Sequence, residues 1–135
     1  MGNVGKVAMS DLISDTTTDV GQALQTLASS LRDTPAFISF EQAASDLKND
    51  VEAQNAISVY QSKQRSLQAL IMLNALSAED RAELEQLENA VYTNQTISAY
   101  LEAQNALVAL CCAVNDRISN AIGIRFAIRQ GGCCG

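Results

Sequence analysis

The stretch that decides the fold is Gln95–Ile128, QTISAYLEAQNALVALCCAVNDRISNAIGIRFAI. Its apolar residues recur every three or four positions, which is the spacing of one face of an α-helix. One stripe consists of Ile97, Leu101, Val108, Cys111, Ile118 and Ile122, and a second consists of Tyr100, Leu107, Leu110, Val114 and Ala121. The pattern predicts one helix about 50 Å long, at about 1.5 Å per residue. Because this exceeds a compact domain of this size, part of the helix is expected to pack against another subunit in a homodimer.

The remainder of the chain lacks the turn residues that separate β-strands. No glycine occurs between Gly21 and Gly123, and Pro35 is the only proline. Apolar residues at helical spacing therefore predict four further helices, with approximate bounds of 19–32, 35–48, 51–76 and 78–92. We expect an all-α fold of about five helices, two of them long, in an elongated and dimeric bundle.

The junctions between these helices carry recognisable capping residues. Thr18 or Asp19 can cap the first helix, and Ser77 can cap the fourth. Asn49 or Asp50 should break the second helix from the third and cap the third, and Asn49 with Glu52 resembles a capping box. Thr93 or Asn94 should break the fourth helix from the fifth. The predicted organisation is a flexible arm at residues 1–17, a helical domain at 18–129 and a Gly/Cys tail at 130–135.

Composition excludes several classes of function. The chain has 135 residues, a net charge of −6 and no histidine, and its sequence pI is near 4.4. An acidic chain is a poor match for a phosphate backbone, and the missing histidine removes the commonest general base and zinc ligand. We therefore expect no enzyme and no direct nucleic-acid binding. No 18-residue apolar run and no signal peptide are evident, so we expect a cytoplasmic protein without a membrane span.

Two of the four cysteines lie in the glycine-rich tail. Adjacent Cys133 and Cys134 could bind a metal, could be incidental thiols, or could have a redox or disulfide role; all three interpretations remain open. Two thiolates cannot complete a four-thiolate site, so a metal would need ligands from other chains. Cys111 and Cys112 are expected to pack as small hydrophobic residues in the helical core.

Charged residues form two local groups. Arg117, Arg125 and Arg129 could contact a partner or RNA, with Arg125 and Arg129 sharing a helix face, or could be a solvated helix end that complements the helix dipole. An acidic group in the fourth helix is predicted to be a solvated or partner-facing surface; it consists of Glu79, Asp80, Glu83, Glu85 and Glu88.

Several of these features occur together in one known family. A Phe-containing helix (Phe37, Phe40) precedes the junction Asn49-Asp50-x-Glu52-Ala53, which opens a long helix with Gln64 about a dozen residues on. The later stretches are Asn94–Ala103, NQTISAYLEA, and Asn115–Ser119, NDRIS. Over roughly residues 19–125 the chain resembles the YlbF/YmcA family of control-of-competence regulators.

The resemblance implies a non-enzymatic regulator that acts through protein partners as an all-helical oligomer. Some members of the family work with paralogues in a complex that guides ribonuclease Y in RNA maturation. Cysteines near the C-terminus of some members help to hold iron–sulfur clusters, which here points to Cys133 and Cys134 as ligands of a 4Fe–4S cluster shared with partner chains. These two residues are adjacent, whereas the family pattern is spaced. The alternative function is a cofactor-free structural or scaffold module.

Overall fold

The computed structural model describes residues 9–125, and within that range the chain forms five α-helices and no strand. The helices are α1 (Met9–Arg32), α2 (Pro35–Asn49), α3 (Val51–Met72), α4 (Ala78–Thr93) and α5 (Gln95–Ile122). The predicted all-α class and the order of the helices are therefore confirmed.

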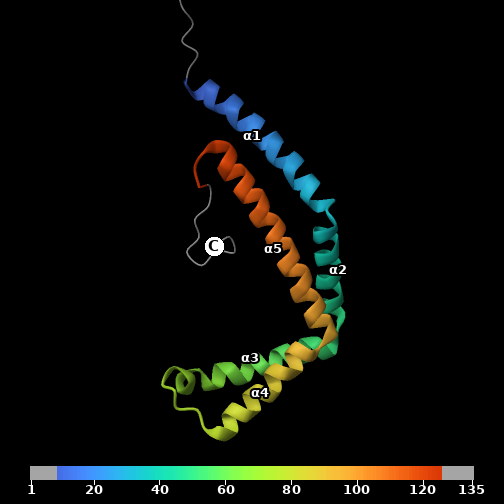
Figure 1. The fold of residues 1–135 in the computed structure, drawn as a ribbon, viewed down its shortest axis with the longest axis vertical. Helices are drawn as coiled ribbons and strands as arrows, with labels where there is room; N and C mark the ends of the chain where they lie inside the picture. Colours follow the sequence, from blue (N-terminus) through green and yellow to red (C-terminus); the bar gives the residue numbers. More distant parts are fainter. Residues whose placement is uncertain (1–8, 126–135) are drawn as a thin grey trace, which may run out of the picture.

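The helices form an open, elongated arc rather than a closed bundle (Figure 1). α1 and α2 follow each other along the outer side of the arc, α5 lies along the inner side of α2, and α3 and α4 form a hairpin at the lower end. The α2–α5 contact is the most extensive, followed by the α3–α4 contact, whereas α1 packs mainly on α2. Much of α1 therefore lacks a partner helix in the chain.

Side chains cap the starts of the last four helices. The Thr34 hydroxyl accepts a hydrogen bond from the Phe37 backbone N–H (3.3 Å), and the Ser77 hydroxyl accepts one from Asp80 (3.0 Å). Asn94 accepts one from Ile97 (3.0 Å), so Asn94 rather than Thr93 starts α5. The capping box expected at Asn49 is wrong, because α2 continues through Asn49, whereas the other predicted cap, Asp50, is confirmed as the cap of α3.

Three helix boundaries differ from the sequence prediction by more than one residue. α1 begins at Met9, ten residues before the expected start at Asp19. α3 ends at Met72 instead of Leu76, shortly before Asn74, whose φ of 50° is left-handed. α5 ends at Ile122 instead of Ile128, because Gly123 adopts a left-handed φ of 73° that terminates a helix readily.

The buried core is small and lies where the helices meet. Among the described residues, the buried ones are Ala43, Ala53, Leu67 and Ile97. The rings of Phe40 on α2 and Tyr100 on α5 pack with their centroids 5.5 Å apart, tilted by 40°. Large apolar side chains elsewhere on the helices are exposed, and Val51 and Met72 reach 81% and 80%. The described part of the fold therefore leaves large apolar side chains uncovered.

Candidate interaction surface

Asp50 joins the two halves of the arc. One carboxylate oxygen caps α3 by accepting a hydrogen bond from the Ala53 backbone N–H at 3.0 Å. The other accepts a hydrogen bond from the Thr96 hydroxyl, in the first turn of α5, at 2.6 Å. A single side chain therefore starts α3 and fixes its first turn to α5, which sets the direction in which the α3–α4 hairpin leaves the α2–α5 pair.

The Asp50 carboxylate is stabilised in its charged form. The hydrogen bond from Thr96 and then the one from Ala53 lower the pKa of Asp50 below its ordinary value of 3.8, against a smaller opposing effect of burial. The junction is therefore built around an ionised carboxylate, which fits a structural role better than proton transfer near neutral pH.

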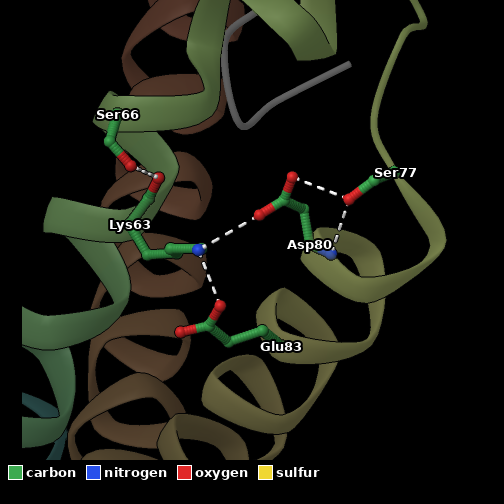
Figure 2. A network of polar contacts seen from close by, with 5 residues as sticks. All are labelled: Lys63, Ser66, Ser77, Asp80 and Glu83. Carbon is green, nitrogen blue, oxygen red and sulfur yellow. Dashed lines mark hydrogen bonds and ion pairs between the residues drawn. The ribbon is translucent and has the colours of Figure 1, made fainter.

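A second polar network holds α3 against α4 (Figure 2). The Lys63 ammonium on α3 lies 3.2 Å from an Asp80 oxygen and 2.6 Å from a Glu83 oxygen, both on α4. The Ser77 hydroxyl donates to the second Asp80 oxygen at 2.8 Å and accepts from the Asp80 backbone N–H. The Asp80 side chain therefore takes part both in the cap of α4 and in the ion pair that links α3 to α4.

The charges in this network support one another. Hydrogen bonds to Glu83 and Asp80 raise the pKa of Lys63, while hydrogen bonds from Ser77 and Lys63 lower the pKa of Asp80. Two members of the predicted acidic group therefore stabilise the α3–α4 hairpin. Sequence reasoning missed this role because Lys63 lies 17 residues before Asp80 and on another helix.

The basic residues proposed from the sequence do not form a continuous helical face. Arg117 is exposed on α5. Arg125 is also exposed, but it lies beyond the end of α5, so the helical face expected to include Arg125 is not formed there. Arg129 lies outside the described residues, as do the predicted metal ligands Cys133 and Cys134.

The two helical cysteines differ from each other. Cys111 is a free, exposed thiol, so its predicted burial in the core is wrong. Cys112, the next residue, is half-buried. Within residues 9–125, no group of three or more His, Cys, Asp or Glu side chains is placed to hold a metal ion.

Exposed apolar side chains are the main candidate functional feature. On α1, Val20 and Leu24 are 61% and 63% exposed. A second group, here called the α3 tip, consists of Leu70, Ile71, Met72 and Leu73. A third group consists of Ile122, the last residue of α5, and Ile124, which follows the helix; both are exposed. The sequence predicted that these residues belong to apolar helix faces. It did not predict that no other part of the described chain covers them.

α5 is also long and apolar enough to cross a membrane, judged by length and composition alone. Its most apolar 18-residue window has a mean hydropathy of 1.4, and only 6% of that window is buried in the chain. A single such helix is weak evidence for a membrane span. Part of the apolar surface of α5 packs against α2.

Comparison with known proteins identifies the family. The family model for "Control of competence regulator ComK, YlbF/YmcA" matches residues 20–123, which include most of α1 and all of α2 to α5. Searches of curated proteins and of solved structures gave no match. The matched range includes the Asp50 and Lys63 networks together with most of the exposed apolar surface. The chain therefore belongs to the YlbF/YmcA family of competence-control regulators.

Proposed function

We propose that this protein is a non-enzymatic regulatory adaptor that acts by binding other proteins through its exposed helical faces. The observation that carries the proposal is the group of exposed large apolar side chains at the end of α3, Leu70, Ile71, Met72 and Leu73, because apolar side chains exposed together on a protein surface mark interaction sites. The family description supplies the regulatory role.

The α3 tip is the surface that we assign to partner proteins. Met72 and Leu73 are 80% and 75% exposed, and they are the last residue and the C-cap of α3. The Lys63 network links α3 to α4, so the α3 tip belongs to a hairpin whose two helices are held together. An apolar surface on a rigid element loses less conformational entropy on binding than one on a flexible segment.

On the family resemblance alone, we extend the proposal to a cytoplasmic homo-oligomer that works with paralogues in a complex guiding a ribonuclease Y-type enzyme. Arg117 and Arg125 are exposed and available for such contacts. The acidic net charge of −6 favours a protein partner over direct binding of RNA.

An iron–sulfur cluster would require several chains. Cys133 and Cys134 offer two thiolates, whereas a 4Fe–4S cluster is usually held by four. Within residues 9–125, no group of three or more candidate ligands is placed to hold a metal ion by itself. The chain alone does not fit a whole cluster, so we propose that any cluster is shared with partner subunits.

Purification of the complex without oxygen tests the cluster. We expect visible iron–sulfur absorption that disappears in a Cys133→Ser/Cys134→Ser double variant and survives in Cys111→Ser. A colourless, iron-free complex containing the partner proteins would reject the cluster without affecting the adaptor proposal.

A complementation experiment tests the adaptor proposal itself. We expect deletion of the gene in its source organism to lower transformation frequency, and the native chain to restore it. Met72→Glu/Leu73→Glu should fail to restore it at equal protein level, whereas the control Glu85→Gln on α4 should succeed. An unchanged transformation frequency after deletion would reject the regulatory role and favour a structural module.

A further inference from the structure

Two single residues interrupt the helices at the same level of the arc. Asp50 is the one residue between α2 and α3, and Asn94 is the one residue between α4 and α5. Both have extended backbones, with ψ of 99° and 123°. The hydrogen bond from Thr96 to Asp50 places the two interruptions side by side. The α2–α5 pair and the α3–α4 hairpin are therefore connected through one junction.

The two interruptions are built in the same way. Asp50 and Asn94 each cap the following helix, because each side chain accepts a hydrogen bond at 3.0 Å from the backbone N–H three residues on. The two donors, Ala53 and Ile97, are also the least exposed of the described residues, at 0% and 4%. The most deeply buried part of the chain therefore lies directly beside both interruptions.

A side chain from the following helix also binds the end of the preceding helix at each interruption. The Gln54 amide donates to the Leu47 carbonyl at 2.9 Å, and the Ser98 hydroxyl donates to the Tyr92 carbonyl at 3.1 Å. These carbonyls lie in the last turns of α2 and α4, where a helix has no further backbone donors of its own. Both bonds are exposed, so water can replace either bond when the angle between the helices changes.

Each half of the molecule is packed more extensively within itself than against the other half. The α2–α5 and α3–α4 contacts are larger than the α2–α3 and α4–α5 contacts that cross the junction. The Lys63 network adds charged links within the hairpin. Figure 1 shows the same division, with the hairpin leaving the α2–α5 pair at the lower end of the arc. Hinges are a few residues at the ends of elements, between bodies of this kind.

We propose that Asp50 and Asn94 form a double hinge, about which the α3–α4 hairpin swings as one body relative to the α2–α5 pair. The hydrogen bond from Thr96 to Asp50 is the latch that selects the observed angle. Because Asp50 and Asn94 lie outside helical geometry, changes in their backbone angles redirect the hairpin and leave the hydrogen bonds inside α3 and α4 in place.

The hinge controls the position of the α3 tip. α3 has 22 residues, which correspond to about 33 Å of helix, so a rotation of about 20° moves its end by roughly 11 Å. A partner that binds the tip at one angle shifts the population toward that angle. The hinge is a property of the isolated chain, so it goes beyond the proposed function and does not depend on it.

Pulsed electron paramagnetic resonance on the full chain tests the hinge. Spin labels at Glu41 on α2 and Glu85 on α4 report the distance across the junction, and labels at Gln68 on α3 and Glu85 report a distance within the hairpin. All three positions are exposed. Attachment of the labels to ketone-bearing residues introduced there leaves the native cysteines unmodified, and excess unlabelled chain suppresses distances between copies.

Thr96→Val removes the latch hydroxyl and keeps the shape of the side chain. The Glu41–Glu85 distance distribution should widen by about twofold, because the hairpin samples more angles. The Gln68–Glu85 distribution and the helical circular dichroism should not change. Thr93→Val is the matched control, because Thr93 is exposed and its hydroxyl donates to the Asn89 carbonyl within α4. It should leave both distributions as in the native chain.

Ser98→Ala removes the bond across the α4–α5 interruption and should also widen the Glu41–Glu85 distribution, which provides a second readout if Thr96→Val folds poorly. Three results would overturn the hinge: a native width in both variants, equal widening by Thr93→Val, or equal widening within the hairpin. None of these measurements uses a partner or a cell. Failure of the complementation experiment therefore rejects only the adaptor role, and an unchanged distance distribution rejects only the hinge.

Discussion

Ile97 and Leu67 are the two large side chains among the buried residues of the described part of the chain, and Ile97 is the less exposed, with 4% of its surface accessible. It lies in the first turn of α5, and its backbone N–H donates to the Asn94 cap. Ile97→Ala should lower the free energy of unfolding by about 3 kcal/mol, because it removes buried methyl groups and leaves a cavity. Urea denaturation followed by circular dichroism measures the loss.

Ile38 provides the matched control for this substitution. It is the same residue type, it lies within a helix, and it is 56% exposed. Ile38→Ala should cost less than about 1 kcal/mol, because little apolar surface is returned to water. Equal losses of unfolding free energy in Ile97→Ala and Ile38→Ala would mean that the core of this chain does not lie at the start of α5.

The ionised state of Asp50 makes the junction sensitive to acid. The folded-state pKa of Asp50 is lowered, so its stabilising effect is fully present above the ordinary value of 3.8 and is lost as the pH falls through the folded pKa. The melting temperature should therefore decline below that pH. Thr96→Val removes the largest cause of the shift, so the acid-induced decline should be shallower in this variant.

A melting temperature measured across a pH series in both proteins decides this point. The chain has no histidine, so no histidine titration obscures the comparison near neutral pH. Asp80 also has a lowered pKa, but its partners are Ser77 and Lys63, so Thr96→Val leaves that contribution intact. Identical acid profiles would show that the Thr96 hydrogen bond does not stabilise the charged form of Asp50.

At the scale of the helices, the sequence predicted the starts of α2 to α5 better than the ends of α3 and α5, whereas the start of α1 was wrong by ten residues. Ser77 and Asn94 carry side chains that can accept a backbone hydrogen bond, and both begin helices. The end of α5 was placed six residues too late, because apolar spacing continues through Gly123 and only the left-handed φ of 73° stops the helix. Spacing reports which face is apolar, whereas a terminus depends on the backbone conformation of one residue.

Asn94 separates α4 from α5 and caps α5. Asn94→Ala should lower the free energy of unfolding by about 1 kcal/mol, because the Ile97 N–H loses its acceptor. The same substitution allows residue 94 to adopt helical geometry, so that α4 and α5 can join into one helix. The angle between α4 and α5 should therefore become more variable. Chemical denaturation measures the first effect, and backbone amide relaxation by NMR measures the second.

Asn89 is the control for the capping substitution. It is an exposed residue within α4, so Asn89→Ala gains helix propensity and should be neutral or stabilising by a few tenths of a kcal/mol, roughly. A loss at Asn89 as large as that at Asn94 would contradict a specific capping role.

For the whole molecule, the sequence predicted the helical class and an elongated shape but not which apolar residues are covered. Cys111 and Ile122 belong to the stripe predicted for α5, and both are exposed. α2 has 15 residues against 28 in α5, so it cannot cover the whole of its partner. Burial depends on the relative lengths and directions of the helices, which are set by junction contacts such as Asp50 to Thr96 that lie far apart in sequence.

The open arc makes thermal stability depend on protein concentration if α1 pairs with a second copy. Association stabilises the folded state in proportion to the occupancy of the dimer. Between about 1 µM and about 100 µM, the melting temperature of the native chain should rise by an amount on the order of 5 °C. Leu24→Glu should remove this dependence, whereas Gln22→Glu should retain it. Scanning calorimetry under reducing conditions measures all three, and reduction prevents exposed Cys111 from mimicking association through intermolecular disulfides. A native melting temperature that is independent of concentration would mean that Val20 and Leu24 on α1 stay exposed to solvent across this range of concentration.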